Sequence, residues 1–229
     1  MSKKMMLLAL AVASAALFAL PAFASAEEIH WDTSTTFTGS GAAGALKAKG
    51  EPTIGCGSID VTNGTVSAGG TTGSMTLDFT GCSAPNPLGG TAPCKSKGAP
   101  LNNTIASKST YHLITWKNTP GAAFPAALVT VETTEFECSV FGFSIVTHVE
   151  GNVIGTITSP VCGGSSNKLT LSFKETTDSS GNPTQEHELY TGHLYDLIGR
   201  TGAGGTPVTA ALEGEVTLTE NTAGTLTCT

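Results

Sequence analysis

Six cysteines constrain what this chain can fold into more than any other feature, because they follow an N-terminal export signal. The signal has a basic start at Lys3 and Lys4, a run of 14 residues from Leu7 to Leu20 that is apolar apart from Ser14, and the small residues Ala24-Ser25-Ala26 that a signal peptidase accepts. An uncleaved anchor is the less favoured alternative, since a membrane span needs about 20 apolar residues. We expect cleavage after Ala26 and a secreted chain of residues 27–229, in an oxidising exterior where cysteines form disulfides.

The six cysteines predict three disulfides, although their spacing alone does not choose the connectivity. Cys82 and Cys94 flank the first half of Ser83 to Asn103, a stretch rich in Pro, Gly and Asn that is long for a loop inside a compact domain. A bond between them would hold this loop. The preferred pairing is Cys82–Cys94, Cys56–Cys138 and Cys162–Cys228. The alternative keeps the first bond and joins Cys138 to Cys162 and Cys56 to Cys228.

Composition and periodicity indicate strands. The chain has 36 Thr and 28 Gly, only 13% of its residues are charged, and its mean hydropathy is +0.11. Threonine suits a half-exposed pleated surface better than a helix surface. Apolar and polar residues alternate in the segments 75–79, 169–173 and 212–218, and residues 144–158 look like a hairpin that turns at Glu150-Gly151-Asn152. We predict an all-β fold, an antiparallel β-sandwich stapled by disulfides, with the jelly roll as one version of it.

The mature chain is long enough for a single domain, residues 27–229, with one ordinary core. Residues 33–50 are rich in Gly, Ala, Ser and Thr, so we expect 27–50 to be a loose N-terminal arm. Only Thr191 to Gly199 could form a short helix, and its pattern is ambiguous.

Several short motifs can be compared with a known group of proteins. They are Phe79-Thr80-Gly81-Cys82, Pro93-Cys94, Phe136-Glu137-Cys138, and the run from Gly151 to Ile157 that ends at Pro160. This pattern resembles an uncharacterised family of secreted, strand-rich, cysteine-containing proteins from high-GC Gram-positive bacteria, over roughly residues 35–173. The resemblance implies an exported protein. It supplies no active site.

Charge argues against two kinds of partner. Cleavage removes Lys3 and Lys4 from the 11 basic residues and leaves nine against 18 acidic ones, a formal charge near −9. Nucleic acids and anionic membranes both favour clustered Lys and Arg, so neither is an expected partner. The chain has no second apolar run after the signal, so we expect no membrane span after cleavage.

Two sets of metal-ligand residue types occur near the C-terminus. His187 and His193 lie among Glu186, Glu188 and Asp196. The two histidines are six positions apart, which on a strand places them on one face but far from each other, so exposed polar residues are the favoured interpretation.

The second set is Asp178, Ser180 and Asn182, which mimics the opening of a calcium loop. Pro183 stands where that loop needs Gly, and Leu189 stands in place of its closing Glu, so a plain turn is favoured. We expect no metal site and no cofactor.

No catalytic residue stands out. The chain lacks a Gly-x-Ser-x-Gly elbow, and its histidines have no recognisable partner motif. A triad can assemble from distant residues, so a secreted hydrolase stays as the third hypothesis. The pairs Glu135 with Glu137 and Glu213 with Glu215 are two residues apart on expected strands. Same-side carboxylates favour a solvated face over the two acids of a glycosidase, which flank a substrate.

The leading hypothesis is a non-catalytic secreted or envelope-associated β-protein with a structural or interaction role. The alternative is a carbohydrate-binding module, which would use aromatic side chains as platforms for sugar rings. Trp116 and Tyr111 are the best candidates for such platforms. The sequence does not identify the partner, and cell-wall polysaccharide or another envelope component is the candidate to test.

Overall fold

A computed structural model describes residues 29–228, with gaps at 68, 101–102, 118–122, 141, 179, 186–188, 191–192, 195–196 and 203. The expected signal peptide, residues 1–26, lies outside the described residues. The described part of the chain has strands and no helix. The strands are β1 (Ile29–Trp31), β2 (Thr36–Gly41), β3 (Gly44–Ala48), β4 (Ile54–Cys56), β5 (Ser58–Val66), β6 (Thr72–Thr80), β7 (Ser83–Pro85), β8 (Thr91–Ser96), β9 (Ile105–Lys117), β10 (Ala123–Val140), β11 (Phe143–Ser159), β12 (Ser165–Phe173), β13 (Glu175–Thr177), β14 (Pro183–Gln185), β15 (Leu189–Tyr190), β16 (His193–Leu194), β17 (Leu197–Thr201) and β18 (Val208–Cys228).

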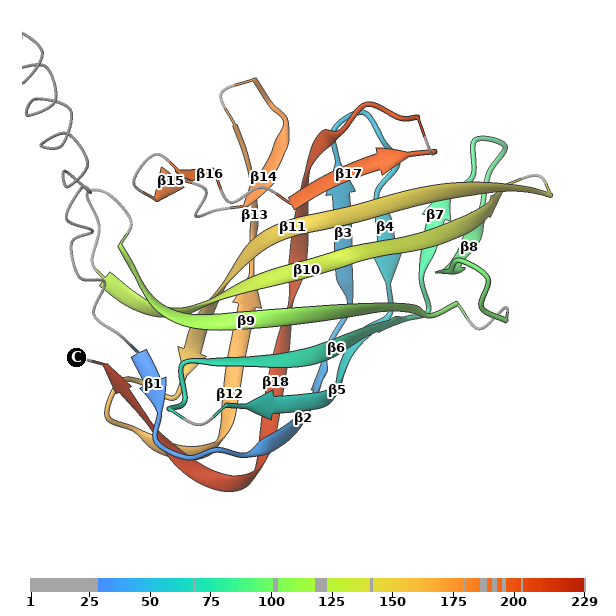
Figure 1. The fold of residues 1–229 in the computed structure, drawn as a ribbon. Helices are drawn as coiled ribbons and strands as arrows, with labels where there is room; N and C mark the ends of the chain where they lie inside the picture. The colour runs from blue at the N-terminus through green and yellow to red at the C-terminus, as the bar shows by residue number, and fades with distance from the viewer. Residues whose placement is uncertain are drawn as a thin grey trace, which may run out of the picture.

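The predicted antiparallel all-β fold with two facing layers is confirmed, and both layers belong to one sheet. In Figure 1, β9, β10 and β11 run across the view in front, and β3, β4, β12 and β18 cross behind them. The sheet closes on itself, because β11 pairs with β10 as well as β12, and β18 pairs with β12, β2 and β3. Closure leaves few unpaired edges for another chain to pair with.

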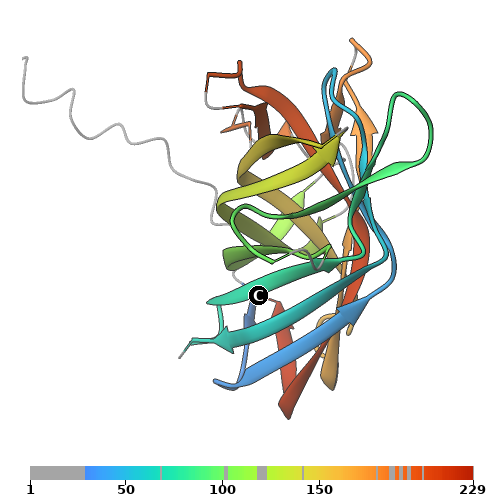
Figure 2. The same ribbon diagram turned by 90° about the vertical axis from the view of Figure 1, so that its right-hand side faces the viewer.

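Three long strands, β10, β11 and β18, run through two adjoining rings of strands. One ring adds β2, β5, β6, β9 and β12; we call it the filled lobe. The other ring adds β3, β4, β7, β8 and β17; we call it the hollow lobe. Figure 2 faces the side on which the β7–β8 and β10–β11 hairpins of the hollow lobe project.

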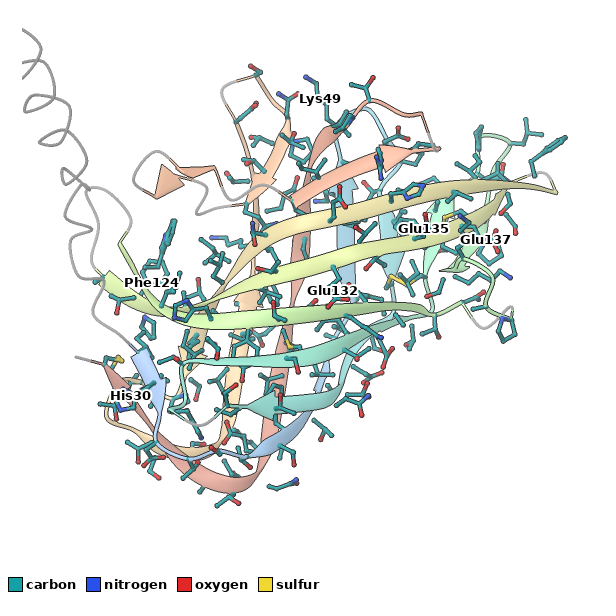
Figure 3. All side chains as sticks on the ribbon, viewed as in Figure 1. His30, Lys49, Phe124, Glu132, Glu135 and Glu137 are labelled. Carbon is teal, nitrogen blue, oxygen red and sulfur yellow. A yellow bond between two sulfur atoms is a disulfide. The ribbon has the colours of Figure 1, made fainter. Side chains whose placement is uncertain are left out.

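Strand β10 shows how one strand serves both lobes. Its first part, residues 123–131, pairs with β9, and residues 136–138 pair with β8. A register shift between Val131 and Thr134 separates the two parts. In Figure 3, Phe124 accordingly lies toward one end of β10, and Glu135 and Glu137 lie toward the other. The shift re-aims the strand where the two rings meet.

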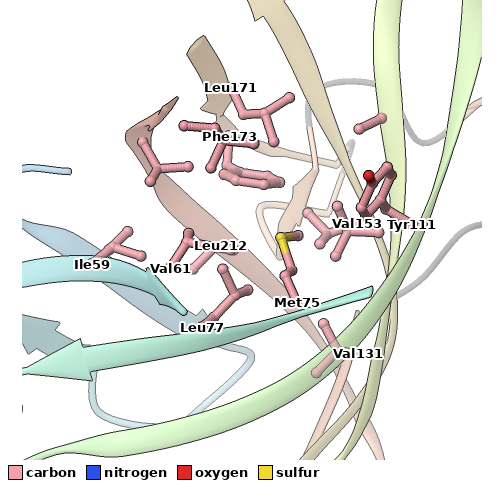
Figure 4. Close-up of a cluster of buried hydrophobic side chains, with 14 of the residues drawn as sticks. Ile59, Val61, Met75, Leu77, Tyr111, Val131, Val153, Leu171, Phe173 and Leu212 are labelled. Atoms are coloured by element: carbon pink, nitrogen blue, oxygen red, sulfur yellow. The ribbon is translucent and has the colours of Figure 1, made fainter. Parts of the chain in front are cut away.

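The filled lobe contains the densest part of the hydrophobic core. Its strands turn alternate apolar residues inward, as period-two strands do, and large side chains meet there. Figure 4 shows part of this cluster, which includes Ile59, Val61, Met75, Tyr111 and Phe173. Burial of such side chains is worth about 1.5–3 kcal/mol each.

Two of the three disulfides join neighbouring strands in the wall of the hollow lobe. They are Cys56–Cys82 and Cys94–Cys138. The four cysteines stand in one row across β4, the start of β7, β8 and β10, because Gly55 pairs with Ser83, Ser83 with Pro93, and Cys94 with Cys138. The third bond, Cys162–Cys228, ties the chain after β11 to the end of β18.

The row corrects the preferred pairing at two bonds, Cys82–Cys94 and Cys56–Cys138. Cys82 and Cys94 do lie side by side, but each is bonded to its other neighbour in the row. Bonding them would leave Cys56 and Cys138 three strand spacings apart, about 14 Å, which exceeds the span of a disulfide. The alternative bonds Cys138–Cys162 and Cys56–Cys228 are also absent from the described structure. The bond Cys162–Cys228 belongs to the preferred pairing.

Three other expectations about local structure are corrected. Residues 29–48, expected as a loose arm, form β1, β2 and β3, all of which pair with β18. The expected loop 83–103 contains the hairpin β7–β8. The expected hairpin at 144–158 is one strand, β11, because its alternation keeps the same parity through Gly151. Part of the ambiguous segment 191–199 lies outside the described residues, and residues 197–199 begin β17.

Candidate functional site

The hollow lobe contains a cavity of about 280 Å³, which we call the cup. Its lining comes from β3, β4, β7, β10, β11 and β17, so the ring of strands itself forms the wall. Exposed residues such as Glu51, Pro52 and Pro85 belong to the lining and mark the mouth. Concave, mostly apolar spaces of this kind are typical of small-molecule sites.

Small inward residues explain why the cup is empty. Ala48, Ala210 and Gly199 stand together on the adjacent strands β3, β18 and β17. A Cβ added at Gly199 would lie 3.3 Å from the Cβ of Ala48 and 3.8 Å from that of Ala210. Opposite them, β7 contributes Ala84. None of these positions supplies a side chain longer than one methyl group, so the middle of the ring stays unfilled.

The cup has an apolar wall with two hydroxyl groups. Thr147 of β11 and Thr201 of β17 are directly paired across the strands, and both line the cup. Arg200 also borders the cup, but it is paired with His148, and both alternate to the outer face. The only arginine of the chain therefore offers the cup its backbone rather than its charge.

Charged groups of the wall lie on its outer face and pair there. Lys97 Nζ lies 2.8 Å from a carboxylate oxygen of Glu135, and that hydrogen bond is the main reason that the Glu135 pKa is lowered. Glu135 also lies 3.0 Å from His148 Nδ1. Lys95 lies 3.2 Å from Glu137, whose pKa is lowered first by the Ser144 hydroxyl and then by Lys95. These contacts account for the Glu135 and Glu137 pair.

A second, smaller cavity of about 60 Å³ lies next to the cup; we call it the inner cavity. Leu46, Ile54 and Val149 line both spaces and so form the partition between them. The inner cavity has two polar side chains in its lining, Ser107 and Thr134, and these are hydrogen-bonded to each other at 2.8 Å. Its surface is therefore effectively apolar.

Exposed apolar side chains stand around the mouth of the cup. Ile145, which lines the cup, is 41% exposed, and Phe143 at the start of the same strand is 76% exposed. Leu88, 83% exposed, follows Pro87 of the cup lining in the β7–β8 connection. Large exposed apolar residues gathered at one opening favour contact with another molecule.

The two aromatic residues predicted as sugar platforms are wrong as candidates. Trp116 is only 1% exposed and packs with Ala126 and Ile154. Tyr111 is 9% exposed, its hydroxyl donates to the Thr65 carbonyl at 2.9 Å, and burial raises its pKa. A sugar ring cannot stack on a side chain that the protein already covers on both faces.

The remaining candidate residues are structural where they can be described. Asp178 accepts backbone hydrogen bonds from Ser180 and Asn182, both at 2.8 Å, and so organises its own turn. Glu213 pairs with Lys47 at 3.0 Å. No cluster of three metal-ligand side chains occurs among the described residues. The side chains of His187 and His193 lie outside the description.

Glu220 is a buried acid that the sequence did not single out. It lies in the filled lobe beside Tyr111 and Trp31, next to a cavity of only about 20 Å³. Burial raises its pKa to about 7; the Trp31 indole opposes the shift and the charge of Asp32 adds to it. Acids with such a pKa often mark active sites, but this space holds little more than one water molecule.

In sequence terms, the cup is marked by small residues at alternate strand positions. Gly and Ala at these positions resembled loop or arm composition, since nothing in one sequence shows which face of a strand meets an interior.

In the described residues, no helix has the length and apolar character needed to cross a membrane. Comparison with known protein families, with curated proteins and with solved structures finds no match to this chain.

Proposed function

We propose that this protein is secreted after cleavage behind Ala26 and acts as a non-catalytic extracellular binding protein whose cup holds a small apolar molecule. The observation that carries the proposal is the cup itself, an apolar space of about 280 Å³ open to solvent. An unfilled apolar cavity costs stability, so its presence favours a use.

The construction of the wall supports the same proposal. Two disulfides cross-link four neighbouring strands of the hollow lobe, so the cup keeps its shape without a ligand. A preformed site avoids the entropy cost of ordering its wall on binding. The paired charges on the outer face leave the inside uncharged, which suits an apolar guest.

The proposal is tested with 1-anilinonaphthalene-8-sulfonate, a dye that fluoresces when it enters an apolar site. We expect the mature, disulfide-bonded protein to bind the dye at one site. Thr147→Trp places a large ring inside the cup and should weaken binding by about tenfold or more.

The matched control is Val146→Trp. Val146 is the preceding residue on the same strand, and successive residues point to opposite faces, so its side chain leaves the cup open. This variant should bind the dye within about twofold of the original protein, and thermal unfolding should show both variants folded. Absence of dye binding by the original protein, or equal weakening in both variants, would contradict the proposal.

A further inference from the structure

The cup and the inner cavity are arranged in series. Leu46, Ile54 and Val149 stand between them, and residues such as Val131 and Ile105 line only the inner cavity. The partition is made of aliphatic side chains, which change rotamer without breaking a hydrogen bond. Resting on the proposed function, we propose that the ligand is an unbranched alkyl chain with a small polar head, and that its tail passes the partition into the inner cavity.

The size of the inner cavity favours a chain over a ring. A space of about 60 Å³ admits several methylene groups in line but is too small for a fused ring system. Its two hydroxyls already bind each other, so the tail meets no unsatisfied polar group. Apolar cavities of this kind stay dry, and a tail that enters one gains burial without displacing bound water.

The position of polar groups along the path favours a head at the mouth. Thr147 and Thr201 are the paired hydroxyls of the cup, and they lie on the solvent side of Val149 and Gly199 along the same two strands. Hydroxyls both donate and accept, so they can serve a carboxylate or an alcohol. Below them, the inner cavity is lined by apolar side chains as far as Val131, apart from the Ser107 and Thr134 hydroxyls, which bind each other.

The test is displacement of the dye by straight-chain carboxylates from hexanoate to hexadecanoate. We expect affinity to rise about fourfold with each added methylene until the tail fills the inner cavity, and then to level off. Val131→Phe fills only the inner cavity. It should weaken the longest chains by about tenfold and leave hexanoate within about twofold, so that the plateau comes at a shorter chain.

Two further variants guard against misfolding and indirect effects. Ile105→Phe fills the same cavity from another strand and should shift the plateau in the same direction. Val66 borders the cavity of about 20 Å³ in the filled lobe instead. Val66→Leu should therefore leave the dependence of affinity on chain length unchanged. Thermal unfolding establishes that each variant is folded.

Failure of this inference is distinct from failure of the proposed function. Adamantane-1-carboxylate carries the same head on a compact cage that the cup can hold and the inner cavity cannot. If it displaces the dye but the straight chains show no dependence on length, or if Val131→Phe weakens every chain equally, the inference is overturned and the proposed function stands. If no carboxylate displaces the dye and Thr147→Trp has no effect, both fall.

Discussion

The filled and hollow lobes share three strands yet have opposite interiors. The filled lobe turns Phe37, Tyr111 and Phe173 inward, leaves about 20 Å³ beside Glu220, and shares the inner cavity of about 60 Å³ with the hollow lobe. The hollow lobe presents Ala48, Gly199 and other small residues and encloses about 280 Å³. The path of the backbone is a ring of antiparallel strands in both, so the size of the inward side chains decides whether a ring becomes a core or a container.

The two lobes also differ in what holds them together. Side-chain packing stabilises the filled lobe, whereas β4 and β7, three residues each, share a single backbone pair in the hollow lobe. Two disulfides reinforce this weakly paired wall. Cross-links and core packing are alternative sources of stability, and a ring that must stay empty depends on the first.

Removal of the disulfides should have the largest effect. Replacing Cys56, Cys82, Cys94 and Cys138 by Ser should lower the free energy of unfolding by about 3–4 kcal/mol for each lost bond and abolish dye binding. Replacing Cys162 and Cys228 by Ser instead opens the longest of the three disulfide-closed loops. The loss of this bond should therefore lower the free energy of unfolding by at least as much as the loss of either other bond, about 4 kcal/mol.

The two sets of disulfide variants should differ in dye binding. Loss of Cys162–Cys228 leaves the wall of the cup cross-linked, so the surviving folded protein should bind the dye with near-normal affinity. Denaturant unfolding and dye titration, run on the same samples, separate the two effects. If all three bonds influence binding alike, the comparison between the lobes is wrong.

Truncation of a core side chain should have the next largest effect. Phe173 is buried in the filled lobe so closely that a Cβ on Gly155 would lie 2.8 Å from its ring. Phe173→Ala should therefore lower the free energy of unfolding by about 3–5 kcal/mol. Ile145→Ala, at the half-exposed wall of the cup, should cost below about 1 kcal/mol. Similar losses from urea titration of both variants would show that the cup is packed after all.

Glu220 should produce a smaller, pH-dependent effect. Its folded-state pKa of about 7 exceeds the ordinary 4.5, so the folded protein holds this proton more tightly than the unfolded chain. Its contribution to stability is therefore complete below about pH 4.5 and is lost as the pH rises through 7. We expect a loss of about 1–3 kcal/mol across this window.

Glu220→Gln isolates this contribution. Surface groups with lowered pKa values, such as Glu135 and Asp178, act in the opposite direction at lower pH, and they are common to both proteins. The difference between the two stability curves, measured by thermal unfolding from pH 4 to pH 8, should fall with rising pH. A flat difference would mean that water reaches the carboxyl group and that the filled lobe is looser than its packing indicates.

Strands β6 and β12 of the filled lobe could be predicted from the sequence, because their inward residues are large and apolar. Met75, Leu77 and Phe79 mark β6, and Leu169, Leu171 and Phe173 mark β12. The same rule fails where the interior is empty. Strands β3, β7 and β8 consist mostly of small residues and prolines, and Leu46 is their only large apolar side chain, so no repeated alternation in hydropathy reveals them.

Turn residues misled the prediction in a second way. Asn63-Gly64 is a pair typical of tight turns, but here it forms a bulge inside β5, with Asn63 at a φ of 52°. Gly151 likewise lies inside β11 rather than between two strands. Residues that permit a turn also permit a bend in a long strand, and closure of the sheet needs such bends. The row of four cysteines depends on the register of β4, β7, β8 and β10, and this register cannot be deduced from the spacing of the cysteines in the sequence.

The sharing of β10, β11 and β18 has a consequence for how such a molecule can change. Each ring is closed only with the help of the three shared strands. Removing the strands that belong to one ring alone would leave unpaired backbone groups along β10, β11 and β18, and these could pair with neighbouring molecules. The hollow lobe and the filled lobe must therefore evolve together as one unit. A ligand that binds in the cup stabilises the folded state as a whole, so its binding free energy also stabilises the filled lobe.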